Sequence, residues 1–568
     1  MNKTLINGIT ELISIALGKQ PSCPSPLPLQ DEYSKSTFER ESRLASYAEE
    51  YDAACKFSIV IISNGRGAEL KRATLNSIMS QQYDNWEAFA EIPEGYSTQY
   101  VSKLHNISGL STDNELLKIA AEMATGDIVL AINAGDVLKP FALGLCAREY
   151  ENRSKPELLY CDCEYRYHGS VCPRPFFKPA ASVEAVLCSG FYADGLFVGR
   201  RLFKKVCTEC SSEKHPLREL AVKCFTTAKS LTQISSVLLS VLHEEPSLVN
   251  TSELSAYNKH SSKATPALFN GKFAGGLQYR CNTGKASVRI IIHAKAELAS
   301  LQACLDSIDS RLTYKHCGIT IVSAPPLCNS TRLNDYLRAI KRNKAAEVVY
   351  AAKDMSVPEL LNLGADVSAA DALVFVDPNA VIKTSDFVER LLEPLCIKGV
   401  GACGGKLYDI SGMLLHTGQI IGLNGWCSSL YKGTQDDNID EMKCFYTAMQ
   451  RGVSAVDGRF MAVNAAVFRK AGKFDASLSG IGWDVGLCLA MTERGSRCVY
   501  TPFAEAVIGK TCAVAAADKK SLERYYDVLR SSLIGGDPYY SARYDCSSPI
   551  PSYAVSPPSP ITLNPLYN

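Results

Sequence analysis

The chain has 568 residues, more than one hydrophobic core normally serves, so two domains with extensions are expected. Its formal net charge of +1 argues against a protein that binds nucleic acid through bulk electrostatics, and we expect no nucleic-acid partner. The chain has no run of about 18 apolar residues and no sequence that resembles a signal peptide, so we expect neither a membrane-spanning helix nor a leader.

The 22 cysteines are scattered, without the paired Cys-x-x-Cys spacing of a zinc ribbon. Reduced and mostly buried thiols in a cytoplasmic protein are the favoured interpretation. A metal cluster at Cys161, Cys163, His168 and Cys172 is the alternative.

The protein is expected in the cytoplasm, and peripheral association with the inner face of the membrane is a second expected location. The sequence does not predict the oligomeric state.

Residues 1–55 are predicted to form an N-terminal extension. Leu5–Leu17 places its apolar residues on one helical face, and residues 21–28 form a Pro/Ser-rich linker. A helix docked on the first domain is favoured over a membrane-surface helix, because basic residues are few on its other face.

Residues 56–285 are predicted to form the first α/β domain. The apolar run Ser58–Ile62 indicates a strand, and the phrase Leu75–Ile78 lies in a helix-like stretch that follows it. A second apolar run, from Asp127, ends at Asn133 and Asp136. Because open α/β sheets bind ligands at the carboxyl ends of their strands, these polar residues indicate a ligand or metal site.

Residues 286–515 are predicted to form a second domain of the same kind, since the motif pair recurs. Val288–Ile292 and Leu305–Ile308 repeat the first strand and helix phrase, about 230 residues later. The run that begins at Asp371 ends at Asp377 and Asn379 and repeats the acidic strand end. A spacing of this size predicts duplicated domains rather than solenoid repeats.

Residues 516–568 are predicted to form a helix, around residues 518–529, and a C-terminal tail. The tail is rich in Pro, Ser and Tyr, which is typical of an extended strap or a disordered segment. The alternation of apolar strands with helix-period segments predicts two α/β domains with mostly parallel sheets.

The order of the motifs resembles that of tandem family-2 glycosyltransferases of the bacterial surface-polysaccharide type, which have the Rossmann-like GT-A fold. In the first domain the likeness covers Phe57–Asn64, Thr74–Glu87, Ala124–Asp127, Asn133–Asp136, Leu159–Asp162 and Phe176–Pro179. In the second it covers Leu361–Ala365, Asp377–Asn379, Val400–Tyr408, Leu415–Leu423, Gly458–Phe468, Gly472–Asp475 and Gly482–Leu489.

The resemblance implies transfer of a sugar from a nucleotide-sugar donor to a glycan or lipid-linked glycan acceptor, with inversion at the anomeric carbon. It also implies a divalent metal, Mg²⁺ or Mn²⁺, that neutralises charge on the diphosphate leaving group. A carboxylate is expected to act as general base on the acceptor hydroxyl, worth about 10²–10⁴ in rate.

In the first domain the resemblance makes Asp136 the metal ligand, with Asn133 beside it, although a capping Asp in a turn is the structural alternative. Asp162 is expected to line the same cleft. No residue of the first domain clearly matches the family's general base, and Glu219 is the candidate for that role. Ser63 and Asn64, after the first strand, are assigned to the nucleotide sugar.

In the second domain Asp484 matches the family's base. Asp377 and His416 are assigned to the nucleotide sugar and Asn379 to the metal, although an amide oxygen is a poorer ligand for a hard cation than a carboxylate. Thus the first domain keeps the better metal motif and the second the better base. The family's acids are incomplete in both, so the alternative is a non-catalytic double pseudo-glycosyltransferase that binds glycans or serves as a scaffold.

Overall fold

The computed structural model describes residues 41, 43–46, 54–63, 65–110, 112–167, 173–210, 216–243, 263–269, 272–280, 283–437, 441–509 and 519–554. The predicted helix Leu5–Leu17 lies outside these ranges, as do Asn64, His168 and Cys172.

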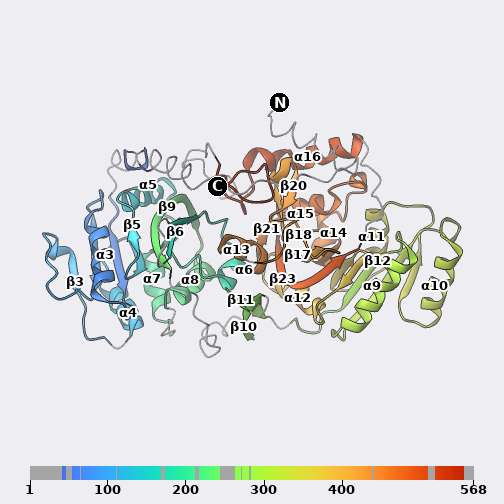
Figure 1. Cartoon of the computed structure of the whole chain (residues 1–568), viewed down its shortest axis with the longest axis horizontal. Helices are drawn as coiled ribbons and strands as arrows, with labels where there is room; N and C mark the ends of the chain where they lie inside the picture. The colour runs from blue at the N-terminus through green and yellow to red at the C-terminus, as the bar shows by residue number, and fades with distance from the viewer. Residues whose placement is uncertain are drawn as a thin grey trace.

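Two large sheets organise the chain, and they have the same strand order. The first runs β3-β2-β1-β4-β8-β6-β9-β5 and the second β14-β13-β12-β15-β22-β17-β23-β16. In each order only the fifth and the last strand run against the others. The predicted fold class, two α/β units with mostly parallel sheets, is therefore confirmed, and the units lie side by side along the molecule (Figure 1).

The first sheet and its helices are formed by β1 (Phe57–Ile62), α3 (Ala68–Met79), β2 (Trp86–Ala90), β3 (Leu104–Asn106), α4 (Asp113–Met123), β4 (Ile128–Asn133), β5 (Val137–Leu138), α5 (Ala142–Asn152), β6 (Leu158–Tyr167), β7 (Arg174–Phe176), α6 (Val183–Cys188), β8 (Leu196–Gly199), α7 (Arg200–Cys207), α8 (Pro216–Thr227) and β9 (Leu231–His243). A hairpin of β10 (Lys263–Phe269) and β11 (Lys272–Arg280) follows.

The second sheet and its helices are formed by β12 (Val288–His293), α9 (Leu298–Arg311), β13 (Cys317–Ser323), α10 (Thr331–Arg342), β14 (Glu347–Tyr350), α11 (Val357–Asp366), β15 (Ala372–Val376), β16 (Ala380–Ile382), α12 (Phe387–Leu395), β17 (Val400–Asp409), β18 (Leu414–His416), α13 (Glu441–Ala448), β21 (Arg451–Val453), β22 (Phe460–Asn464), α14 (Ala465–Ala471), α15 (Trp483–Glu493) and β23 (Arg497–Ile508). The short pair β19 (Gln419–Ile421) and β20 (Cys427–Ser429) stands apart, and α16 (Lys519–Gly535) follows.

Helix boundaries follow local capping rules. Thr112 caps α4 by accepting a hydrogen bond from the backbone N–H of Glu115. Ser356 and Glu359 form a capping box at the start of α11. Asn464 caps α14, which ends at Gly472 in the left-handed conformation that glycine adopts at little cost.

Both faces of the second sheet are buried, which explains its nearly continuous apolar strands. One apolar cluster includes residues of α9, α10 and α12, and the other residues of α11, α14, α15 and α16. The core of the first unit continues into the second, because it also contains residues such as Tyr408, Leu430, Phe445 and Tyr446. The two units thus share buried surface.

The start of α6 connects the units through polar contacts. Glu184 forms a 2.5 Å ion pair with Arg497 of β23, and its carboxylate is fully buried. Ser182 Oγ accepts a hydrogen bond from the backbone N–H of Gly452, which lies in β21. Because a buried charge left alone is costly, these partners fix how α6 meets the second unit.

Residues 537–554 pack against both units after α16. The Asp537 carboxylate accepts a 2.6 Å hydrogen bond from the N–H of Ile421, and the carbonyl of Pro538 accepts one from Ala180. Arg543 Nε lies 3.8 Å from Oδ2 of Asp162 in β6, and both side chains are buried. The predicted site residue Asp162 is thus part of an inter-unit ion pair, and its Oδ1 accepts a hydrogen bond from the N–H of Lys178.

No helix in the described ranges is long and apolar enough to cross a membrane. The described cysteines are free and mostly buried, as predicted. Cys161 and Cys163 lie in the apolar core of the first unit, and no cluster of three or more His, Cys, Asp and Glu side chains among the described residues could hold a metal ion.

Replacing Arg543 with Met should destabilise the protein by about 3–5 kcal/mol, because Asp162 would remain buried without its cation. Arg524→Met is the matched control, since Arg524 pairs with Asp475 at the surface and should change stability by less than about 1 kcal/mol. Urea denaturation measures both variants, and equal midpoints would contradict the role given to Arg543.

Candidate active site at the carboxyl edge of the second sheet

Strand connectivity reverses between β12 and β15. From β12 the chain proceeds to β13 and β14 on one side, and it then crosses to β15 on the other. In open α/β sheets ligands bind at such a reversal, beyond the carboxyl ends of the strands. His293 ends β12 and Asp377 follows β15, and His293 Nε2 lies 3.8 Å from Asp377 Oδ2.

The turn from β15 to β16 holds its polar groups tightly. Asp377 Oδ1 accepts hydrogen bonds from the backbone N–H and from Nδ2 of Asn379, at 2.8 and 2.9 Å. Asn379 is 8% exposed, and its Oδ1 has no hydrogen-bond partner among the described residues. The turn therefore presents one carboxylate oxygen and one buried amide oxygen.

An aspartate–arginine pair precedes β22, the antiparallel neighbour of β15. Arg459 binds Asp457 with two side-chain hydrogen bonds, of 2.9 and 2.6 Å. Burial opposes ionisation of Asp457, but Arg459 outweighs it and holds the pKa of this carboxyl below its usual range. The carbonyl of Arg459 also accepts a 2.8 Å hydrogen bond from the N–H of Asp377, which joins the two strand ends.

Asp484 lies in the first turn of α15. Its two oxygens accept hydrogen bonds from the backbone N–H groups of Gly458 and Val485, at 3.0 and 2.9 Å. Burial, with a smaller contribution from the charge of Asp457, raises the pKa of Asp484 to about 6. The side chain is only partly buried, and at neutral pH it is mostly ionised.

His416 completes the group of predicted residues in the second unit. Its Nδ1 lies 3.1 Å from Ser429 Oγ, and its Nε2 accepts a 3.4 Å hydrogen bond from the N–H of Asp457. Burial lowers the pKa of His416 to about 4, so the ring is neutral at neutral pH. Asp377, Asn379, His416 and Asp484, which the sequence predicts, are thus connected through the segment 457–459.

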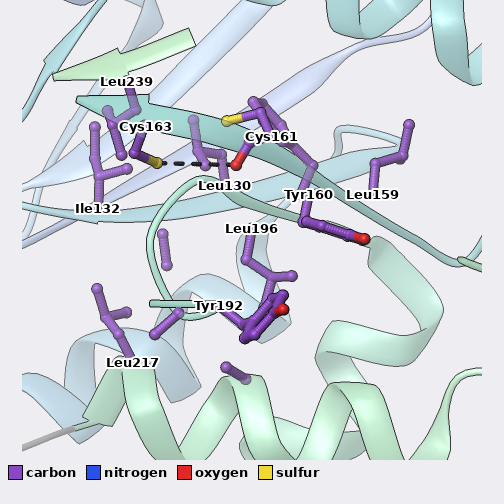
Figure 2. Close-up of a cluster of buried hydrophobic side chains, with 14 of the residues drawn as sticks. Leu130, Ile132, Leu159, Tyr160, Cys161, Cys163, Tyr192, Leu196, Leu217 and Leu239 are labelled. Atoms are coloured by element: carbon purple, nitrogen blue, oxygen red, sulfur yellow. Dashed lines mark hydrogen bonds between the residues drawn. The ribbon is translucent and has the colours of Figure 1, made fainter. Parts of the chain in front are cut away.

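The matching strand registers identify the equivalent positions of the first unit, and their chemistry differs. By strand register, Ile62 replaces His293, Phe176 replaces His416, Tyr192 replaces Asp457 and Asp194 replaces Arg459, whereas Asn133 stands at the position of Asp377. Tyr192 and Leu217 lie in a cluster of buried side chains that also contains Leu130, Ile132 and Leu239 (Figure 2).

Asp136 precedes β5, as Asn379 precedes β16, but it is enclosed. Its two oxygens accept hydrogen bonds from the N–H groups of Asn133 and Leu242, each at 3.0 Å, and the residue is 1% exposed. Burial, followed by the charge of Asp194, raises the pKa of Asp136 to about 7. These two hydrogen bonds connect the turn between β4 and β5 to β9.

The other predicted residues of the first unit also have protein partners. Glu219 is buried in α8 and forms a 2.8 Å ion pair with Lys223 one turn later. The N–H of Ser63 donates a 3.1 Å hydrogen bond to Asp113 at the start of α4.

Three residues of the second site were not assigned from the sequence: His293, Asp457 and Arg459. His293 is the last residue of an apolar strand, and its place at that strand end was the available signal. Asp457 and Arg459 stand immediately before a strand, and only its antiparallel direction brings them to the carboxyl edge of the others.

No protein-family model matches the chain. The O-antigen biosynthesis protein RfbC of Myxococcus xanthus is 24% identical over 574 aligned positions, which cover 92% of this chain and 43% of that protein. The uncharacterized protein y4gI of Sinorhizobium fredii is 21% identical over 68% of this chain and 44% of that protein. The chain spans less than half the length of these relatives, and the first confirms the resemblance to proteins of bacterial surface-polysaccharide biosynthesis.

Two solved structures show partial similarity to the chain. GalNAc-T7 with UDP, GalNAc and Mn²⁺ matches at a TM-score of 0.36 and 12% identity, over 45% of this chain and 49% of its own. The mannosyltransferase PcManGT of Pyrobaculum calidifontis, in complex with GDP-Man and Mn²⁺, matches at 0.29 and 14%, over 46% and 63%. Likenesses at this level do not assign a function.

Gly458→Ala should disturb this site, because an added Cβ would lie 2.3 Å from the Trp483 ring and 3.0 Å from Asp484 Cβ. Overpacking of this kind costs about 1–3 kcal/mol. Gly190→Ala is the control, since no atom lies within 4 Å of its added Cβ. Thermal unfolding and tryptophan fluorescence check the pair, and unchanged values for Gly458→Ala would show that Trp483 is not packed as described.

Proposed function

We propose that the chain is a glycosyltransferase that moves a sugar from a nucleotide-sugar donor to a glycan or lipid-linked glycan, and that the second unit performs the reaction. One observation carries the proposal: the polar residues of the second unit converge at the strand reversal, whereas the first unit has apolar Ile62 and Phe176 at the positions of His293 and His416. The similarity to RfbC supports an acceptor that belongs to a surface glycan.

Asp484 is the proposed general base. A base works best when its pKa lies near the operating pH, and burial moves the pKa of Asp484 up to about 6. The hydrogen bonds from Gly458 and Val485 fix the direction of its carboxylate. Removal of the acceptor proton as the new bond forms opposite the leaving nucleotide accounts for an inverting reaction.

The turn Asp377–Asn379 fits a divalent cation better than the first unit does. Asp377 Oδ2 and the unpartnered, buried Asn379 Oδ1 are oxygen donors of the kind that Mg²⁺ and Mn²⁺ prefer, and nucleotide phosphates commonly supply further ligands. A cation held there would neutralise the charge that develops on the departing diphosphate. Both oxygens of Asp136 are already engaged by backbone N–H groups.

The first unit is proposed to serve as a scaffold, or as a surface for acceptor, rather than as a second catalyst. Its Ile62, Phe176 and Tyr192 occupy the positions of His293, His416 and Asp457, and its Asp162 pairs with Arg543. The contacts of Ser182, Glu184 and residues 537–554 then hold the catalytic unit in place.

Asp377→Asn should weaken Mn²⁺-dependent binding of the nucleotide at least about tenfold, because a neutral amide replaces the anionic ligand. Asp136→Asn is the matched control and should bind as the wild type does. Isothermal titration with Mn²⁺ and UDP or GDP provides the measurement. The reverse result would place the metal in the first unit, and a wild type that binds no nucleotide would favour the non-catalytic scaffold.

Transfer by the wild type should increase as the pH rises through about 6 and then level off, because the base must be deprotonated and the pKa of Asp484 is raised to that value. Asp484→Asn should lose about 10²–10⁴ of the rate and keep nucleotide binding. Release of nucleoside diphosphate between pH 5 and 8 reports the profile. A flat profile, or an active Asn variant, would refute this role.

A further inference from the structure

We propose that His293 is a third protein ligand of the cation held by Asp377 and Asn379, which makes this a mixed nitrogen and oxygen site that prefers Mn²⁺ to Mg²⁺. The proposal rests on the function proposed above and specifies the chemistry of the same site. It concerns a residue from a different strand, since His293 ends β12 whereas the other two ligands follow β15.

Geometry supports a shared cation. His293 Nε2 and Asp377 Oδ2 lie 3.8 Å apart, which is too long for a hydrogen bond. Two ligand atoms that each lie about 2.1 Å from one ion are at most about 4.2 Å apart. The observed distance therefore lies within the reach of one ion, and Asn379 is held to the same carboxylate by two hydrogen bonds.

The histidine ring lacks other partners in the described part of the chain. It is 5% exposed, its Nδ1 is buried without a hydrogen bond, and no bond from Nε2 is found there. Asn379 Oδ1 is also buried without a partner in the described part of the chain, and such an atom is costly to leave unsatisfied. This oxygen, together with the His293 Nε2 that lies near Asp377 Oδ2 at the strand reversal, indicates that a bound species completes the site.

The chemistry of the ring agrees with this role, because an imidazole nitrogen offers a lone pair to a metal. Nitrogen ligands favour transition metals, whereas Mg²⁺ favours oxygen ligands alone, so the ring biases the site toward Mn²⁺.

Pulsed electron paramagnetic resonance of bound Mn²⁺ tests the assignment directly, because a coordinated imidazole produces ¹⁴N modulation of the spin echo. Wild-type protein with Mn²⁺ and UDP or GDP should show this modulation. His293→Gln supplies an oxygen ligand instead, so it should abolish the modulation while Mn²⁺ stays bound. We expect the dissociation constant for Mn²⁺ to increase about tenfold, and that for Mg²⁺ to change little.

His316→Gln serves as the control, because His316 is exposed, and its spectrum should equal that of the wild type. Bound Mn²⁺ without ¹⁴N modulation in the wild type, or modulation that persists in His293→Gln, would overturn the ligand assignment and leave the glycosyltransferase proposal intact. If neither nucleotide carries Mn²⁺ to the wild-type protein, the proposed function itself fails.

Discussion

The reversal of strand order between β12 and β15 is the constraint on which the second site depends. Two parallel neighbours whose connections leave in opposite directions keep their carboxyl ends uncovered, so polar residues can gather there without interrupting the sheet. His293 and Asp377 are the residues at these two ends. The antiparallel β22 adds Asp457 and Arg459 to the same edge, because its amino end lies beside the carboxyl ends of the others.

The two units show that one topology can hold very different interiors. Their strand orders, directions and registers agree, yet the first has filled the equivalent region with Tyr192, Leu217 and their neighbours. Burial of such side chains stabilises a fold at about 25 cal/mol per Å² of apolar surface, whereas buried carboxylates need partners. One strand topology can therefore accommodate either polar groups or apolar packing at this edge of the sheet.

Sequence reasoning predicted the strands well, because each is an apolar run such as Ser58–Ile62 bounded by polar residues. It also selected Asp377, Asn379, His416 and Asp484, which the structure brings together. For Asp136 the sequence left a metal ligand and a capping residue of the turn as alternatives, and the hydrogen bonds from Asn133 and Leu242 favour the second.

Other features depend on contacts between distant parts of the chain and could not be predicted. The sequence predicts that Asp162 lines a cleft, whereas in the structure it lies beside Arg543. The sequence around either residue does not indicate that the two form an ion pair. The role of Arg459 could not be predicted either. Its side chain binds Asp457, and its carbonyl accepts a hydrogen bond from the N–H of Asp377. The division at residues 285 and 286 and the site roles themselves remain predictions from the sequence.

Residues 537–554 have a consequence for the order of assembly in the cell. Domains generally fold in turn as the chain leaves the ribosome, beginning with the N-terminal one. Both sheets emerge before Pro538, Arg543 and Tyr544, which contact Ala180, Asp162 and Phe177 of the first unit. The direct contacts between the units, such as Glu184 with Arg497, can form before this segment is released, but Asp162 remains without Arg543 until late in biogenesis.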